Sequence, residues 1–119
     1  MTQARLRDMR ILIVEDEHML GAALKDYLEG EEAVVIGPVA RLSEALAIVT
    51  DGQPLDGAVI DVNLAGEKSH LLAEALRSRG IRCILTTGER CDMMPAELLD
   101  LLCLEKPFKF SALATALVA

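Results

Sequence analysis

Short apolar runs alternate with stretches of helical periodicity along the whole chain, and this alternation constrains the fold most strongly. The apolar runs cover residues 10–14, 33–36, 57–60, 81–85 and 101–104. They show little polar alternation, which is typical of parallel strands covered on both faces. Helical spacing follows each run, over residues 20–30, 43–50 (with Ser43 as N-cap), 67–79, 94–100 and 111–118. The pattern predicts five consecutive β/α units.

Consecutive β/α units with right-handed crossovers place helices on both faces of one sheet. We therefore expect a flavodoxin-like three-layer α/β/α fold whose five-stranded parallel sheet has the order 2-1-3-4-5. The 119 residues fit one domain, which we assign to residues 10–119 after an N-terminal extension of residues 1–9. Ligands bind such sheets beyond the carboxyl ends of the strands, so the functional residues are expected there.

Four of the five predicted strands end in side chains that could share a site. Glu15 and Asp16 follow the first strand, Asp61 ends the third, Thr87 ends the fourth and Lys106 follows the fifth. The expected strand order makes the first and third strands neighbours, which brings Asp16 beside Asp61. The fourth strand then brings Thr87 next to Asp61, and Lys106 reaches in from the edge strand.

This set of residue types suits phosphoryl chemistry. Clustered carboxylates repel one another and require a cation, and oxygen ligands with open water positions suit Mg²⁺. A metal and a lysine neutralise phosphoryl oxygens, and the central carboxylate, Asp61, could form an acyl phosphate. The Lys106–Pro107 bond is a candidate cis peptide that would aim the lysine. Each residue alone also has an ordinary interpretation as a cap, turn or surface residue.

Charge and composition exclude several classes of function. The chain has 12 Lys and Arg against 19 Asp and Glu, a net charge of −7, and no tryptophan. This balance disfavours binding to a nucleic-acid backbone or stacking on bases. No apolar run approaches the roughly 20 residues of a membrane span, and no signal peptide is evident. We expect a cytoplasmic protein without nucleic-acid or membrane partners.

The cysteines predict neither a metal site nor a disulfide. Cys83, Cys91 and Cys103 are odd in number and lack CxxC or zinc-finger spacing. We interpret all three as reduced structural thiols.

The ordered motifs at the strand ends resemble the receiver domain of two-component response regulators. The matching segments are Ile13–Glu17, Val59–Leu64, Leu85–Gly88 and Glu105–Phe108. Together they span nearly the whole chain, from about Arg10 to Leu117.

The resemblance implies a metal site and a phosphoacceptor. Asp61 corresponds to the aspartate that is phosphorylated from the phosphohistidine of a sensor histidine kinase. Asp16 corresponds to a direct Mg²⁺ ligand and Glu15 to its water-mediated partner. Asp61 and the main-chain carbonyl of Asn63 would complete the protein ligands.

The resemblance also implies how the signal is passed on and ended. Thr87 and Lys106 would bind phosphoryl oxygens, and the threonine would couple the site to the face formed by the family's fourth helix, fifth strand and fifth helix. Asn63 and Glu89 occupy positions that tune autodephosphorylation, and two polar residues there predict a short-lived phosphoryl group. We expect the chain to be a phosphoacceptor rather than an enzyme that acts on a metabolite. We also expect it to be a monomer or weak homodimer and to signal to a downstream protein. The length leaves no room for a DNA-binding output.

Three positions depart from the family's pattern. Cys103 stands three residues before the lysine, where the family often has a switching Tyr or Phe. The segment 64–67 lacks the usual proline-containing loop motif, and Gly88 replaces the usual alanine after the threonine. Thr87-Gly88 is similar to the core of an alphaproteobacterial single-domain subgroup named for Phe-Ala-Thr-Gly-x-Tyr, which implies a mobile fourth helix.

Two other functions stay open on the sequence. A pseudo-receiver would use the same fold as an interaction module without phosphorylation, but the intact Asp61, Thr87 and Lys106 argue against it. A Mg²⁺-dependent phosphohydrolase with an aspartate nucleophile is a poorer match, because such enzymes carry Asp-x-Asp on the first strand and this chain has Glu15-Asp16 there.

Overall fold

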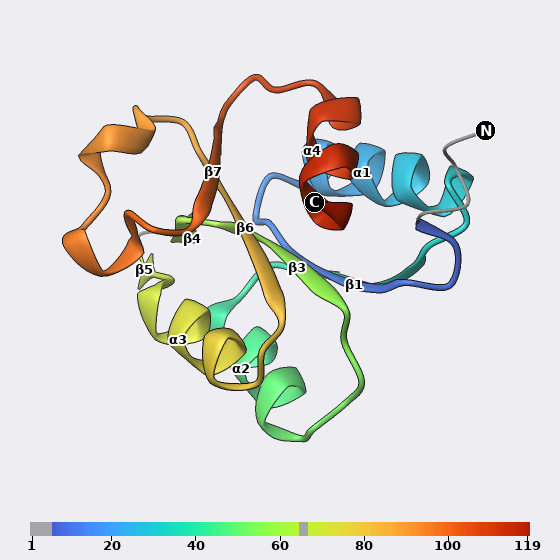
Figure 1. Cartoon of the computed structure of the whole chain (residues 1–119), viewed down its shortest axis with the longest axis horizontal. Helices are drawn as coiled ribbons and strands as arrows, with labels where there is room; N and C mark the ends of the chain where they lie inside the picture. The colour runs from blue at the N-terminus through green and yellow to red at the C-terminus, as the bar shows by residue number, and fades with distance from the viewer. Residues whose placement is uncertain (1–5, 65–66) are drawn as a thin grey trace.

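A five-stranded parallel sheet forms the centre of the computed structural model, which describes residues 6–64 and 67–119 (Figure 1). Its strands are β1 (Arg10–Val14), β2 (Val34–Val39), β3 (Gly57–Asp61), β6 (Arg82–Thr87) and β7 (Leu102–Glu105). The order across the sheet is β2-β1-β3-β6-β7, and all neighbours are parallel. Counted along the chain this is the order 2-1-3-4-5, so the predicted flavodoxin-like fold is confirmed.

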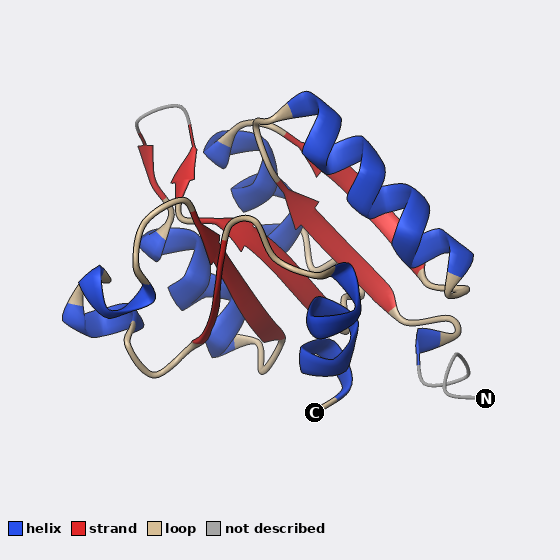
Figure 2. Cartoon of the chain, turned by 90° about the horizontal axis from the view of Figure 1, so that it is seen from above, coloured by secondary structure: helices blue, strands red, loops and turns tan. Residues whose placement is uncertain are grey.

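Helices cover both faces of the sheet and complete the three layers (Figure 2). They are α1 (His18–Gly30), α2 (Leu42–Thr50), α3 (His70–Ser78) and α4 (Phe110–Val118). Two hydrophobic clusters separate the layers. One packs Leu24 of α1 and Leu113 of α4 against Ile11 and Ile13, and it also buries Leu6 of the N-terminal extension. In the described part of the chain, no helix is long and apolar enough to cross a membrane.

The second cluster lies on the opposite face of the sheet. Here Val49 of α2 and Leu72 of α3 pack against Leu12 and Val14 of β1. Successive residues of β1 thus point into different clusters, as the pleat of a strand requires. Burial on both faces explains why β1 reads as a continuous apolar run rather than an alternating one.

Gly37 makes an irregularity in β2 that shapes the end of β1. Its φ is 102°, and a Cβ built there would lie 2.8 Å from both the carbonyl oxygen of Ile13 and the amide nitrogen of Val39. The register between the strands shifts at this point, after Leu12. Beyond the shift, the backbone N–H of Glu15 donates to the carbonyl of Val39 at 2.9 Å. The close approach allowed by glycine therefore fixes the backbone at the first acidic position.

The segment after β3 differs from the expectation in where its helix begins. The sequence predicted a helix from residue 67, but residues Glu67–Lys68 form strand β5, antiparallel to β4 (Asn63–Leu64), and α3 begins at His70. Ser69 fixes this boundary, because its buried Oγ donates to the carbonyls of Asp61 and Val62 at 3.1 and 3.0 Å. Residues 65–66 of the segment discussed above lie outside the described part of the chain.

A smaller difference concerns the start of α2. The helix begins at Leu42, one residue before the predicted N-cap. Arg41 is the N-cap residue, without a side-chain capping bond, and Ser43 lies inside the helix.

The predicted helix over 94–100 is wrong. Residues 88–101, all of them described, contain two single 3₁₀ turns instead, η2 (Cys91–Met93) and η3 (Ala96–Leu98). Met94 is extended at φ −65° and ψ 151°, as residues before a proline tend to be, and Pro95 lacks the N–H that a continuous helix needs. The family's fourth helix is therefore not an α-helix in this chain.

We expect Gly37→Ala to lower the free energy of unfolding by about 2 kcal/mol or more, because it combines a positive φ with a backbone clash. Gly52→Ala is the matched control. Gly52 has a φ of 78° but nothing within 4 Å of its Cβ position, so the expected loss is about 1 kcal/mol. Urea unfolding of both variants measures the difference, and equal losses would contradict the role given to the close approach.

Candidate functional site

Four strand ends meet at the carboxyl edge of the sheet and form one cleft, as the strand order predicts. The cleft is lined by Asp16, Glu17, Asp61, Val62, Asn63, Thr87, Gly88, Glu89 and Lys106. Glu15, Asp61 and Thr87 are buried, whereas Asp16 is exposed. The structure therefore brings together the acidic, hydroxyl and lysine side chains that the sequence selected.

The carboxylates form a set that fits a hard divalent cation. One oxygen each from Glu15, Asp16 and Asp61 lies within 4.8 Å of the others. The backbone N–H of Asn63 donates to Asp61 Oδ1 at 3.0 Å, which holds the carboxylate in one orientation. An all-oxygen set at the mouth of an open cleft leaves room for water ligands, which is the arrangement that Mg²⁺ prefers.

Lys106 neutralises this acidic cluster from the edge strand. Its Nζ donates to Asp61 Oδ2 at 3.0 Å and to Glu17 Oε2 at 2.7 Å, and it lies 3.2 Å from Glu15 Oε1. Burial alone would lower the pKa of Lys106, but the hydrogen bonds to Glu17 and Asp61 and the charges of Asp61 and Glu15 raise it above its usual value. The lysine is therefore a permanent cation in this site.

Backbone geometry positions the lysine. The N–H of Lys106 donates to the carbonyl of Thr87 at 2.7 Å, which continues the pairing of β6 with β7. The Lys106–Pro107 peptide bond, which the sequence marked as a cis candidate, is cis, and Gly37–Pro38 is a second cis bond.

Glu17 is a member of the site that the sequence reading missed. Its carboxylate makes the shortest contact of Lys106, at 2.7 Å, although its side chain is 60% exposed. The available signal was its place as the third acid in the run Glu15-Asp16-Glu17. Because the Glu17 side chain is exposed, it can turn away into solvent, and its contact is the one that Lys106 can most easily break.

Glu15 has an unusual protonation equilibrium in the protein without bound metal. Burial, with repulsion by Asp61 and a hydrogen bond to it, raises the pKa of Glu15 to about 7. The N–H of Glu17, which donates to Glu15 Oε2 at 3.0 Å, and the charge of Lys106 oppose this rise. It is therefore unfavourable for Glu15 and Asp61 to be ionised at the same time, and a bound cation would reduce the repulsion between them.

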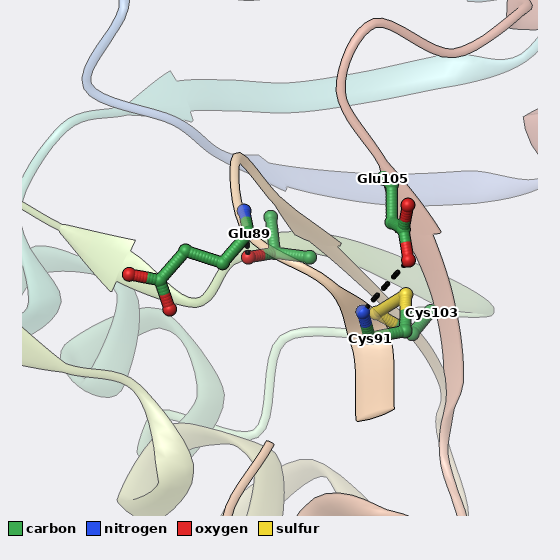
Figure 3. The surroundings of a disulfide bond; sticks show 5 residues. Glu89, Cys91, Cys103 and Glu105 are labelled. Carbon is green, nitrogen blue, oxygen red and sulfur yellow. Dashed lines mark hydrogen bonds between the residues drawn. A yellow bond between two sulfur atoms is a disulfide. The ribbon is translucent and has the colours of Figure 1, made fainter. Parts of the chain in front are cut away.

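Thr87 presents its hydroxyl at the start of the loop after β6. Its Oγ1 accepts a hydrogen bond from the backbone N–H of Glu89 at 2.9 Å. The Glu89 side chain is exposed and points away from the neighbouring cysteines (Figure 3). A shift of the Thr87 hydroxyl would therefore pull directly on the backbone at residue 89.

The interpretation of all three cysteines as reduced thiols is wrong. Cys91 and Cys103 form a disulfide, with their Cα atoms 5.9 Å apart (Figure 3). The sequence could not show this pairing, because the loop after β6 and strand β7 become neighbours through the tertiary fold. Cys83 is free and buried, and burial raises the pKa of its thiol to about 12.

We predict that Glu15→Gln changes the pH dependence of stability. A glutamate with a raised pKa holds its proton in the folded state, so folding loses stability as pH rises from about 4.5 to 7. In a chelator, the unfolding free energy of E15Q minus that of the parent should rise over this range by up to about 3 kcal/mol and then level off. Urea unfolding between pH 4.5 and 8 measures it, with Glu44→Gln, an exposed glutamate of α2, as control. A flat difference for E15Q would contradict the assignment.

Comparison with known proteins agrees with this geometry. The family model of the response regulator receiver domain matches residues 11–118. The TorCAD operon transcriptional regulatory protein TorR of Escherichia coli O157:H7 is 37% identical over 79 residues, covering 66% of this chain and 34% of that protein. The chain thus spans about a third of the length of this curated relative.

Two solved structures resemble the whole domain. The solution structure of SdrG from Sphingomonas melonis Fr1 is 38% identical, covers 100% of both chains and has a TM-score of 0.80. The BeF3-activated conformation of SdrG from Pseudomonas melonis Fr1 is 39% identical over 92% of this chain and 96% of that chain, with a TM-score of 0.76. From the family match and the fold together, this chain belongs to the response regulator receiver domain family of two-component systems.

Proposed function

We propose that this chain is a phosphorylation switch in which Asp61 accepts a phosphoryl group from a phosphohistidine of a sensor histidine kinase. The observation that carries the proposal is the position of Asp61. Its Oδ2 lies 3.0 Å from Lys106 Nζ, and its carboxylate belongs to the cluster with Glu15 and Asp16. A nucleophilic carboxylate between a cation site and a lysine is the arrangement that phosphoryl transfer requires.

The residues of the chain have separate tasks in this transfer. An oxygen of Asp61 attacks phosphorus, the bond from phosphorus to the histidine nitrogen breaks, and the imidazole leaves with its electron pair and takes a proton. Lys106 passes from the carboxylates to a phosphoryl oxygen, and the Thr87 hydroxyl donates to another. Mg²⁺ would be held by Asp16, Asp61 and the Asn63 carbonyl, with Glu15 acting through water, and it would neutralise charge at the phosphoryl group.

The same site would end the signal by hydrolysis. Asn63 and Glu89 line the same cleft as Asp61, and both are exposed and polar. Each can orient a water for attack on the acyl phosphate, so we infer a short-lived phosphoryl group. The protein promotes its own phosphorylation and dephosphorylation and turns over no separate metabolite.

The output is a change in contacts with a downstream protein. We assign it to the surface of residues 90–101, β7 and α4, because this surface adjoins Thr87 and Lys106. It presents the exposed apolar side chains of Met93, Leu99 and Leu102. We further propose that residues 10–119 act in the cytoplasm as a monomer or weak homodimer, without nucleic-acid or membrane partners.

Phosphorylation of the intact chain tests the proposal. With Mg²⁺ and acetyl phosphate we expect the intact mass to rise by one phosphoryl group, because the donor can replace a kinase at an activated aspartate. Asp61→Asn should abolish the gain, EDTA should prevent it, and Asp51→Asn, at the exposed end of α2, should retain it.

The alternatives give different results in the same experiment. No gain in mass from acetyl phosphate or from a phosphorylated kinase would favour a pseudo-receiver that binds partners without phosphorylation. Continuous release of phosphate from small phosphoesters would favour an aspartate-dependent phosphohydrolase.

The lifetime of the phosphoryl group should depend on the two polar residues beside Asp61. We expect Asn63→Ala and Glu89→Ala each to slow the loss of phosphate several-fold, because each variant removes a polar side chain that orients the water for attack on the acyl phosphate. The decay of the phosphorylated mass after removal of the donor measures this. Glu97→Ala, an exposed glutamate of η3 outside the cleft, is the control. Unchanged decay in both cleft variants would overturn the roles given to Asn63 and Glu89.

A further inference from the structure

We infer that the Cys91–Cys103 disulfide is a redox-reactive site that controls whether the segment between β6 and β7 can respond to the phosphorylation state of Asp61. This inference rests on the proposed function for its coupling to phosphate and on the proposed cytoplasmic location for its physiological role, whereas cleavage of the bond by a reductant rests on neither. The two sulfurs join the loop after β6 to strand β7 (Figure 3).

Along the chain, both cysteines lie between the two residues that would hold the phosphoryl oxygens. Cys91 is four residues after Thr87, and Cys103 is three residues before Lys106. The carboxylate of Glu105 adds a second link, since its Oε2 accepts the backbone N–H of Cys91 at 2.9 Å (Figure 3). The start of the segment is therefore fastened to two residues of β7, Cys103 and Glu105.

The segment has few other anchors among the described residues. Its two 3₁₀ turns are single turns, and of its side chains Met94 and Leu98 are buried while Met93 and Leu99 are exposed. Arg77 of α3 holds the far end through Asp100, at 3.0 Å. A segment with few buried contacts has a low free energy of local opening, so a covalent bond at its start restricts it strongly.

The disulfide is accessible to a reductant, unlike the third cysteine. Cys91 and Cys103 are both half-buried, whereas Cys83 is 6% exposed and its thiol pKa is about 12. Reduction requires a thiolate to reach a sulfur of the bond, so exposure decides which site reacts. In a cytoplasmic protein, disulfides are usually transient and catalytic or redox-sensing rather than structural, which favours a reversible role.

The reaction is an exchange with a dithiol protein or small dithiol. One thiolate of the reductant attacks a sulfur of the bond, and the other cysteine leaves as a thiolate that takes a proton. The second thiolate of the reductant then displaces the first cysteine in the same way. The reductant becomes a disulfide, and its two electrons reside in the thiols of Cys91 and Cys103. A disulfide oxidant reverses the sequence.

The structural consequence follows from the path between Thr87 and Cys91. The Thr87 hydroxyl holds the N–H of Glu89, so a movement of Thr87 toward a phosphoryl group displaces residue 89 and the chain beyond it. With the disulfide closed, this displacement stops at Cys91, which is tied to β7. With the disulfide open, it extends into η2 and η3. The oxidised protein can therefore accept phosphate while its output surface stays in the resting arrangement.

The first experiment tests the redox step without phosphate. The oxidised chain should be lighter than the dithiothreitol-treated chain by two hydrogens, and hydrogen exchange of residues 91–101 should become about ten-fold faster on reduction. The double variant Cys91→Ser, Cys103→Ser should exchange fast in either condition, and Cys83→Ser should respond as the parent does. Equal exchange before and after reduction, or three free thiols in the chain treated with a disulfide oxidant, would overturn the inference.

The second experiment tests the coupling. Hydrogen exchange at residues 91–101 is compared with and without Mg²⁺ and beryllofluoride, in the oxidised and the reduced chain. We expect a change on activation in the reduced chain and none in the oxidised chain, with Asp61→Asn unresponsive in both. An equal response in both redox states would overturn the coupling. If beryllofluoride affects neither state, the coupling and the output surface assigned to residues 90–101 fail, while phosphorylation of Asp61, which the mass measurement tests, and the redox step of the first experiment stand.

Discussion

The attraction between Lys106 and the acidic side chains is the interaction on which the site depends. Glu15 and Asp61 are buried close together, and a buried pair of carboxylates is costly without a partner of opposite charge. Lys106 supplies that charge from β7, across β6, at 3.0 Å from Asp61. Glu17 is a further, exposed partner of Lys106, and in the proposed function it is the one that the lysine would release to bind a phosphoryl group.

The backbone keeps this charged cluster in place. Gly37 lets β2 approach β1 closely, and the N–H of Glu15 bonds to Val39 just beyond that point. On the other side, Asn63 N–H holds Asp61, and Ser69 binds the carbonyl of the same residue. These bonds restrict the carboxylates to one geometry, so binding of a cation or a phosphoryl group does not have to order them first.

Prediction succeeded where the residues act through repeated local patterns. The apolar runs located all five strands of the sheet. The signal is strongest for β1, β3 and β6, because central strands buried on both faces must be apolar along their length. Prediction failed at residues 67–68 and 94–100, where the helix that the sequence pattern predicted competed with other constraints. Residues 67–68 pair with Asn63–Leu64 of β4, and Pro95 interrupts the second segment. Both constraints outweigh a weak helical propensity.

The linear order of residues determined the fold and the membership of the main site, because parallel strands with a set order bring their carboxyl ends together. It places Glu15, Asp16, Asp61, Thr87 and Lys106 at these strand ends. Only the tertiary structure decided the contact of Glu17 with Lys106 and the pairing of Cys91 with Cys103. Both depend on the distance between side chains far apart in sequence, and that distance is set by how β6, β7 and the loop after β1 pack rather than by any local spacing.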